Sequence, residues 1–346
     1  MKAVYITEHG GTEVLRYGDL PEPSHGPNDL LVRVRACGVN RVDAFTRAGI
    51  KGTRLRLVEP HILGSDVAGD VVATGSEVTS IRTGQRVVVM PRLTCGQCSF
   101  CVAGEEEICV RPASLGTTVN GGYAEYVVVP ATNAVPIPDS MSYVDAAGLP
   151  TVFIPSWNML LRRAELRPWE TVLVLSASSG VGSAAIQVAK NVVGATVIAT
   201  TSTHEKAAMA RELGADEVIV YTEEDVAERA MALTDHHGVN VVVDHVGADS
   251  WTAAMAALAP GGRYCICGVT SGYRAELQMG LLFIRNQTVF GVYMGRKEDL
   301  WHIVDAAAKG AVRAVIHETY PLADTASAHD ALEGRNFFGK LVITVP

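Results

Sequence analysis

The pattern of apolar and polar positions divides the chain into two regions. Up to about residue 150, short alternating stretches are separated by turns rich in glycine and proline, which is typical of a compact β domain. The first residues, 1–7, also alternate like a strand. The other strands expected in this region cover residues 30–35, 67–73, 85–90 and 123–129.

Beyond about residue 139 the pattern changes to alternating strands and helices. One helix is expected to begin after Asp139 or Ser140, and another covers residues 151–161. Predicted strands then cover residues 171–175, 196–200, 217–221, 239–246, 263–269 and 288–292. Helices are expected between them, over residues 182–193, 204–213, 224–233 and 250–259, and the tail adds a helix at 300–309 and a strand at 340–345. Strands joined by helical crossovers predict an α/β fold with a parallel, doubly wound sheet.

Composition narrows the class of protein. A chain of 346 residues predicts about two domains, and 48% hydrophobic with 19% charged residues excludes disorder. The net charge of −8 offers no basic face for nucleic acid or for an anionic membrane. No apolar run is long enough to span a membrane, and the first residues lack a signal-peptide core. These features predict a cytoplasmic protein that binds neither nucleic acid nor membrane.

A turn of small residues after the strand at 171–175 predicts a dinucleotide site. Small side chains let the backbone approach a pyrophosphate, and the following helix presents free amides to it. In the G-x-G-x-x-G template, Ala177 and Ser179 take the first two glycine positions and Gly182 the third. Gly180 and Val181 complete the expected contacts; the alternative is a plain strand-to-helix connection.

The end of the next strand bears on which nucleotide binds. NAD sites carry an acidic residue there for the ribose hydroxyls, whereas this chain has Thr201 and Ser202, followed by Lys206. With Tyr221 at the end of the third strand, these side chains favour NADP(H) over NAD. In the alternative, Lys206 is solvated and Tyr221 is a packing residue.

Four cysteines lie within fifteen residues, at Cys95, Cys98, Cys101 and Cys109. This spacing predicts a tetrahedral zinc ion, one per chain, and a closed shell of four thiolates leaves no position for a substrate. The zinc is therefore expected to hold a loop. The other three cysteines are interpreted as packing residues: Cys37, Cys265 and Cys267.

Several motifs in this order resemble the medium-chain dehydrogenase/reductase superfamily, which includes zinc alcohol dehydrogenases and quinone oxidoreductases. The motifs are residues 36–43, 63–69 and 121–126, together with the four-cysteine loop and the small-residue turn. The resemblance covers essentially the whole chain. It implies a chaperonin-10-like β-barrel catalytic domain (1–152 and 294–346), a Rossmann domain (153–293), a small-molecule substrate and a homodimer or homotetramer. It also implies cofactor contacts at Gly268, Val269, Val292 and Lys340.

Departures from the family pattern affect the chemistry. The three positions that bind catalytic zinc in alcohol dehydrogenases are matched by Asn40, Ser65 and Thr151, which hold zinc poorly. Val42 replaces the hydroxyl residue of the proton relay. The pattern at Asn40 and 64–66 is similar to the quinone oxidoreductase branch, whose members use NADPH without zinc.

These departures favour an oxidoreductase that transfers hydride from NADPH to an activated C=C or quinone-type acceptor. Without a Lewis acid, a conjugated acceptor is easier to reduce because its charge spreads into an enolate. Asn40 is the expected donor to the substrate oxygen, with Thr151 and Ser65 orienting a water molecule or the carbonyl. Asp43 and Asp66 are expected to fix loops, and a purely structural role for Asn40 and Asp43 stays open.

Two other functions stay open. One is a zinc-dependent alcohol dehydrogenase or carbonyl reductase with displaced metal ligands. The other is a non-catalytic NADPH-binding or scaffold protein.

Overall fold

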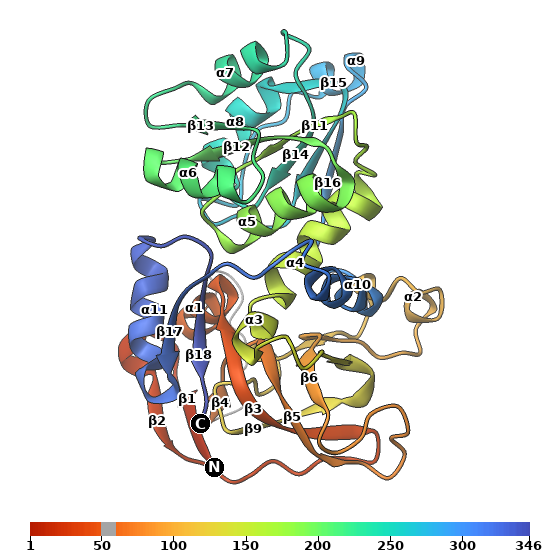
Figure 1. The fold of residues 1–346 in the computed structure, drawn as a ribbon, viewed down its shortest axis with the longest axis vertical. Helices are drawn as coiled ribbons and strands as arrows, with labels where there is room; N and C mark the ends of the chain where they lie inside the picture. The colour runs from red at the N-terminus through yellow and green to blue at the C-terminus, as the bar shows by residue number, and fades with distance from the viewer. Residues whose placement is uncertain (50–59) are drawn as a thin grey trace. The chain divides into compact units, whose positions relative to one another are not determined.

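The computed structural model describes residues 1–49 and 60–346, and the chain forms two compact units (Figure 1). The first unit contains Met1–Thr151, Arg296–Ala308 and Arg313–Pro346. The second contains Val152–Gly295 and Lys309–Val312. Each unit has a hydrophobic core of its own.

The first unit is built around a long central strand, β3 (Asp29–Val39), which is antiparallel to three other strands. Its partners are β5 (Asp66–Thr74), β9 (Tyr126–Pro130) and β18 (Lys340–Thr344). Leu341 of β18 pairs with Val39, so the two ends of the chain meet in one sheet. β6 (Arg86–Val89), β10 (Ala134–Pro136) and β17 (Ile316–Pro321) complete this sheet.

Smaller elements complete the first unit. A three-stranded sheet is formed by β2 (Arg16–Asp19), β1 (Lys2–Ile6) and β4 (His61–Ile62), and a two-stranded one by β7 (Arg92–Leu93) and β8 (Ala113–Ser114). The helices are α1 (Arg41–Ala48), α2 (Ser99–Val102), α3 (Tyr143–Ala147), α10 (Lys297–Ala308) and α11 (Thr325–Gly334). Helix α4 (Pro150–Trp157) begins in this unit and continues into the second.

The second unit contains a six-stranded sheet in the order β13-β12-β11-β14-β15-β16, in which every pair is parallel. The strands are β11 (Thr171–Val174), β12 (Thr196–Thr201), β13 (Glu217–Val220), β14 (Val239–Asp244), β15 (Leu258–Ile266) and β16 (Thr288–Gly291). The helices are α5 (Gly180–Gln187), α6 (His204–Glu212), α7 (Val226–Leu233), α8 (Ala248–Ala256) and α9 (Met279–Ile284). The predicted α/β fold with a doubly wound parallel sheet is confirmed. Residues 158–163 and 188–193 form π-helical turns after α4 and α5.

Some predicted helix and strand boundaries are wrong, and some helices and strands were not predicted at all. The helix expected over 250–259 ends at Ala256, because Leu258 already pairs with Val239 of β14 and the following residues form a bulge before Arg263. The strand expected from residue 123 begins at Tyr126. The helix expected after Asp139 or Ser140 begins at Tyr143, where the side chain of Ser142 accepts a hydrogen bond from the Asp145 amide. The elements that were not predicted are helices α1, α2, α9 and α11 and strands β2, β4, β7, β8, β10 and β17.

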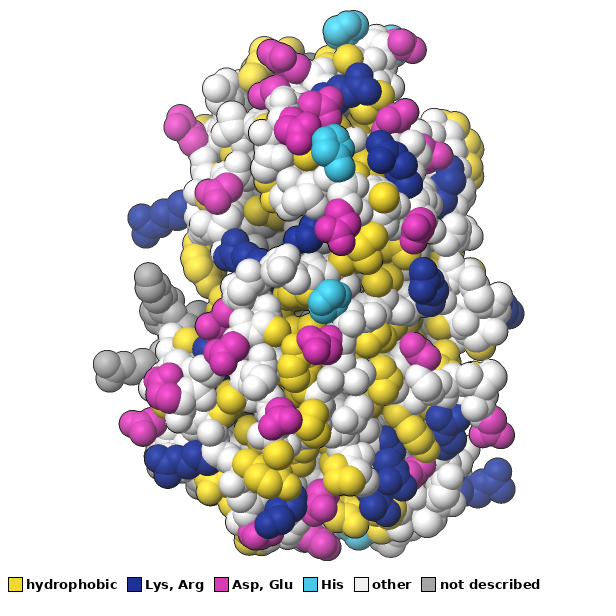
Figure 2. Space-filling view, turned by 60° about the vertical axis from the view of Figure 1, so that its left-hand side comes forward, with side chains coloured by type: hydrophobic (Ala, Val, Ile, Leu, Met, Phe, Trp, Pro, Cys, Tyr) yellow, Lys and Arg dark blue, Asp and Glu magenta, His cyan; other side chains and the backbone are white. Residues whose placement is uncertain are grey.

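The charges on the surface and the hydropathy of the helices agree with what the composition predicts, namely no basic face and no membrane-spanning helix. On the face drawn in Figure 2, acidic and basic side chains are interspersed, and no continuous basic area is visible there. Across residues 1–49 and 60–346, no helix has the length and apolar character needed to cross a bilayer.

Candidate active site and zinc loop

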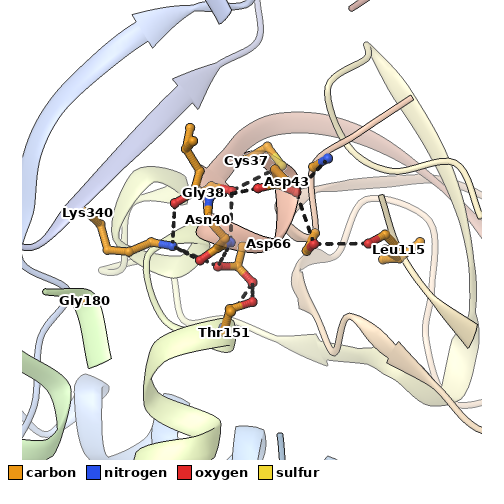
Figure 3. Close-up of polar contacts among 12 residues, drawn as sticks. Cys37, Gly38, Asn40, Asp43, Asp66, Leu115, Thr151, Gly180 and Lys340 are labelled. Carbon is orange, nitrogen blue, oxygen red and sulfur yellow. Dashed lines mark hydrogen bonds and ion pairs between the residues drawn. The ribbon is translucent and has the colours of Figure 1, made fainter. Parts of the chain in front are cut away.

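Asp66, the first residue of β5, is the centre of a buried polar cluster in the first unit (Figure 3). One carboxylate oxygen, Oδ1, accepts hydrogen bonds from the Thr151 hydroxyl at 2.5 Å and the Thr151 amide at 3.1 Å. The other, Oδ2, accepts from the Asn40 side-chain amide at 2.8 Å and faces the Lys340 ammonium at 3.2 Å. Four segments that are distant in the sequence therefore meet at one carboxylate.

Lys340 supplies the positive charge of this cluster. Its ammonium donates to the Asn40 side-chain oxygen at 2.5 Å and to the Val39 carbonyl at 3.0 Å, and its side chain is only 5% exposed. A buried ammonium needs such partners, because desolvation without them is costly. The sequence assigned Lys340 to cofactor binding alone, whereas the structure directs its ammonium to Asn40 and Asp66.

Asn40 was expected to donate to the substrate oxygen. In the structure its amide nitrogen points to Asp66 and, at 3.4 Å, to the Gly38 carbonyl, and its oxygen accepts from Lys340. Both the nitrogen and the oxygen of this side-chain amide therefore already have hydrogen-bond partners within the protein, because a buried carboxylate such as Asp66 needs hydrogen-bond donors. Asn40 holds Asp66 and Lys340 in place.

Asp43 and Ser65 form a second buried group. Asp43 lies in the first turn of α1, where its Oδ2 accepts from the Asn40 backbone amide at 2.8 Å. Its Oδ1 accepts from the Gly64 amide at 3.2 Å. The single hydrogen of the Ser65 hydroxyl is shared between that oxygen, at 3.4 Å, and the nearer Leu115 carbonyl, at 3.1 Å. Burial raises the pKa of Asp43 to about 7, against the opposing effect of the Asn40 amide.

Sequence reasoning missed a set of side chains behind Asp43. The Tyr123 hydroxyl donates to Asp43 at 3.3 Å, and His329 lies 3.4 Å from that hydroxyl. Arg47, whose side chain is 2% exposed, contacts His329 at 3.1 Å and pairs with Glu333. Tyr123 was present in the 121–126 motif, but nothing in the sequence marks His329, which lies 282 residues from Arg47.

The sulfur atoms of the four-cysteine loop lie close together. All four are within 4.8 Å of one another. The sulfur–sulfur distance is 3.5 Å for Cys95–Cys109 and 4.0 Å for both Cys95–Cys101 and Cys98–Cys109. A tetrahedral zinc with Zn–S bonds of about 2.3 Å places its sulfurs about 3.8 Å apart. The cluster therefore fits a structural zinc, and in the described part of the chain it is the one group of three or more metal-ligating side chains.

Backbone amides in the four-cysteine loop stabilise the thiolate form of one of its cysteines. Hydrogen bonds from the amides of Gln97 and Cys98 lower the pKa of Cys95 to about 5. Burial and the neighbouring thiols raise the pKa of Cys101 to about 12. Four thiolates this close repel one another unless a cation lies between them, which is the charge that Zn²⁺ provides.

The predicted nucleotide turn connects β11 to α5. Ser179 is the N-cap of α5, and its side chain accepts from the Gly182 amide at 2.8 Å. A Cβ atom at Gly182 would lie 2.2 Å from the Ser176 carbonyl oxygen, so only glycine fits there. Ala177 is buried before the turn, and Gly180 and Val181 begin the helix, whose first amides can face a phosphate. His245, which the sequence did not indicate, contacts Ser179 at 2.8 Å from the end of β14.

Apart from Lys340, the other predicted cofactor residues lie at the same end of the parallel sheet. Thr201 ends β12 and Ser202 follows it, with no carboxylate at either position; the buried Thr201 hydroxyl has no hydrogen-bond partner. Lys206 lies in the first turn of α6, and Tyr221, directly after β13, is half exposed. Three further predicted residues follow the ends of β15 and β16: Gly268, Val269 and Val292. Carboxyl ends of parallel strands are where such sheets bind ligands.

Comparison with known proteins gives a consistent result. The chain matches the family models "Alcohol dehydrogenase GroES-like domain" over residues 26–139 and "Zinc-binding dehydrogenase" over residues 180–309. It is 32% identical to a quinone oxidoreductase of Pseudomonas aeruginosa over 99% of both chains. It is 31% identical to an acryloyl-coenzyme A reductase of Metallosphaera sedula, covering 99% of this chain and 100% of the relative. A solved NAD-dependent alcohol dehydrogenase is 40% identical, with a TM-score of 0.96 over the full length of both chains.

The zinc loop leads to a first prediction. The purified protein should contain about one zinc per chain, and Cys109→Ser should lose most of it because three thiolates leave the shell open. Thermal unfolding of that variant should begin at a lower temperature. Metal analysis checks the zinc content, with Cys267→Ser as the control that retains zinc. Full zinc in Cys109→Ser would contradict the four-thiolate site.

Proposed function

Because the chain belongs to the medium-chain dehydrogenase/reductase superfamily, it is an NAD(P)H-dependent oxidoreductase, and we propose that it transfers hydride from NADPH to an activated C=C bond or a quinone-type acceptor. We propose that this reaction takes place without a catalytic zinc ion. The observation that carries it is the Lys340–Asp66–Asn40 cluster, which takes up the donors and acceptors at the family's metal-binding positions.

The side chains at those positions do not fit a catalytic zinc. Asn40 and Thr151 are bonded to Asp66, and Ser65 is bonded to Asp43 and the Leu115 carbonyl. None of the three offers a thiolate or an imidazole, which are the ligands zinc prefers. The ammonium of Lys340 would also repel a metal ion placed beside Asp66.

The chemistry of the cluster suits a conjugated acceptor. Bound NADPH would supply the hydride. As hydride reaches the β-carbon of a conjugated carbonyl, negative charge moves to the carbonyl oxygen, and a fixed positive charge nearby stabilises it. Lys340 provides that charge, and Asn40 holds it in place. The names of two relatives, a quinone oxidoreductase and an acryloyl-coenzyme A reductase, are consistent with such acceptors.

The choice of NADPH rests on the residues at the end of β12. Thr201 and Ser202 bring no negative charge against a 2′-phosphate, and the Lys206 side chain follows within one helical turn. The similarity to a solved structure named an NAD-dependent alcohol dehydrogenase is an argument for the alternative, an alcohol dehydrogenase that uses NAD. An assay that compares NADPH with NADH as cofactor distinguishes the proposed reductase from this alternative.

A homodimer or homotetramer is part of the proposal. Strand β16 is the outer strand of its sheet, and the adjacent α9 exposes a group of large apolar side chains. Met279, Phe283 and Ile284 are 74%, 72% and 67% exposed. An apolar patch beside an open sheet edge is expected to be covered by a second copy.

The second prediction tests the reaction. Oxidation of NADPH, followed by its absorbance, should proceed with enones, enoyl-CoA esters or quinones and not with simple ketones, because no Lewis acid is present to polarise a ketone. NADH run in parallel should be the poorer cofactor. Turnover confined to simple ketones would instead support the zinc-dependent alternative. Cofactor binding without any turnover would support the non-catalytic one.

The third prediction concerns Lys340. Lys340→Met should lower kcat on a conjugated acceptor by about ten- to a hundredfold, since the developing charge loses its stabilising cation. The double variant Lys340→Met with Asp66→Asn removes the unpaired carboxylate, so it separates loss of charge from loss of folding. Lys190→Met, at an exposed ion pair, is the control. An unchanged kcat in the double variant would contradict the role of Lys340.

The fourth prediction concerns assembly. Sedimentation should give a mass of about two or four times the 36.7 kDa of the chain. Phe283→Asp should shift the protein towards the monomer, because a charge in the patch cannot be buried. Trp169→Asp, at a side chain that is 81% exposed elsewhere, should leave the mass unchanged. A monomeric parent protein would contradict the assembly.

A further inference from the structure

His245 is a buried side chain in the second unit, directly after the end of β14. Its ring nitrogen Nε2 lies 3.0 Å from the Leu175 carbonyl oxygen and 2.8 Å from the Ser179 hydroxyl oxygen. Leu175 follows β11, and Ser179 is the N-cap of α5. One imidazole nitrogen therefore contacts both the strand end and the turn that the sequence assigns to a dinucleotide.

The backbone around His245 is held in place by its neighbours. The preceding carboxylate, Asp244 Oδ1, accepts from the amides of Val246 at 2.6 Å and Gly247 at 3.1 Å. A Cβ atom at Gly268 would lie 3.0 Å from the His245 carbonyl oxygen and 3.3 Å from the His245 Cβ, so the next strand end packs closely against it. The ring therefore extends towards Ser179 from a fixed backbone position.

The contact with Leu175 determines where the ring carries a proton. A carbonyl oxygen only accepts hydrogen bonds, so His245 Nε2 must be a donor. Burial lowers the pKa of His245, which favours the neutral ring with its proton on Nε2. A protonated ring would carry a hydrogen on Nε2 as well, so this nitrogen is a donor in both charge states.

A donor at Nε2 fixes the direction of the Ser179 hydroxyl. The single Nε2 hydrogen is shared between the Leu175 carbonyl and the Ser179 oxygen, which also accepts from the Gly182 amide at 2.8 Å. A serine oxygen has two lone pairs, and these two donors occupy both, so its own proton points away from His245 and Gly182. Within residues 1–49 and 60–346, that proton has no acceptor.

Two backbone amides next to this hydroxyl also have no acceptor. Gly180 and Val181 are the first two residues of α5, and in the described part of the chain their amides make no backbone hydrogen bond. Such amides carry the positive end of the helix dipole. The Ser179 hydroxyl adds a third donor where the nucleotide-binding template has a glycine without a side chain. Three unpaired donors in consecutive residues suit the oxygens of an anionic phosphate.

We propose that His245 is a positioning residue for the dinucleotide: it keeps the Ser179 oxygen an acceptor and thereby directs the hydroxyl proton to the diphosphate of the cofactor. His245 acts through Ser179. Without the ring, one lone pair of the Ser179 oxygen is released, and the hydroxyl proton is no longer directed to the ligand. The inference rests on the proposed function, which it deepens by naming a residue that sets the affinity for the cofactor.

The fifth prediction concerns the affinity for NADPH, measured by titration calorimetry without an acceptor. Ser179→Ala should weaken binding by about tenfold, because a hydrogen bond to a charged oxygen is lost. His245→Leu should weaken it by about fivefold. His245→Gln, whose side-chain amide offers a donor at a similar distance along the side chain, should restore most of the affinity. His237→Leu, at an exposed histidine before the opposite end of β14, is the control that should leave the affinity unchanged.

A double-mutant cycle tests whether His245 acts through the Ser179 hydroxyl. In the Ser179→Ala background, His245→Leu should change the affinity by less than about twofold, because the proton that the ring directs is already absent. An unchanged affinity of His245→Leu, or a fivefold loss in both backgrounds, would overturn the inference.

A ligand without the diphosphate separates this role from a general disturbance of the sheet end. Adenosine 2′-phosphate carries the adenine, ribose and 2′-phosphate of NADPH but no diphosphate, so the parent protein and His245→Leu should bind it equally. An equal loss of affinity for NADPH and for adenosine 2′-phosphate would overturn the inference, because the ring would then only support the local structure.

The ring proton can be located without any ligand. Nitrogen NMR spectroscopy of the parent protein, with the His245 signals assigned by comparison with His245→Gln, should show a protonated Nε2. An unprotonated Nε2 would overturn the inference, because the Ser179 hydroxyl would then donate to the ring.

Failure of the proposed function is detected separately. If the parent protein binds NADPH but reduces no conjugated acceptor, the proposed reaction is wrong, and the affinities of the variants still support or overturn the role of His245. If NADH binds more tightly than NADPH, the same variants are compared with NADH, and adenosine replaces adenosine 2′-phosphate. Binding of neither dinucleotide by the parent protein would overturn the inference together with the proposed function.

Discussion

The arrangement of the first unit depends on one buried carboxylate, that of Asp66. It is fully buried and is bonded to the end of β3 through Asn40, to the start of α4 through Thr151, and to β18 through Lys340. Removing one partner of a buried ion pair costs about 3–5 kcal/mol, because the remaining charge is left without compensation. The segments that bring these partners must therefore stay together, which joins the first forty residues of the chain to its last seven.

Two neighbouring carboxylates in this unit have different partners, and this difference separates their chemistry. Asp66 faces an ammonium, whereas Asp43 accepts only from neutral amides and hydroxyls. Burial raises the pKa of Asp43 to about 7, against the opposing effect of the Asn40 backbone amide.

Much of the fold and part of the site could be predicted from the sequence. Strands buried on both faces appear as continuous apolar runs, so the parallel sheet was evident from the sequence. Cysteine spacing alone identified the four thiols that the structure brings together. Family motifs indicated Asn40, Asp66 and Thr151, and the structure brings these three together. The direction of the Lys340 side chain could not be predicted, because it follows from the pairing of Leu341 with Val39, about 300 residues away. The same holds for His329, since α11 is short and its contacts with Arg47 exist only after folding.

A lysine at this place has consequences for substrate choice that a zinc would not have. A divalent ion can polarise an isolated carbonyl, whereas the single charge of Lys340 is already shared with Asp66 and Asn40. The positive electrostatic potential that Lys340 leaves for a substrate is therefore modest. It is sufficient for a negative charge that the substrate itself spreads over several atoms. In the proposed reaction, this cluster would therefore favour acceptors in which conjugation supplies the missing stabilisation of negative charge.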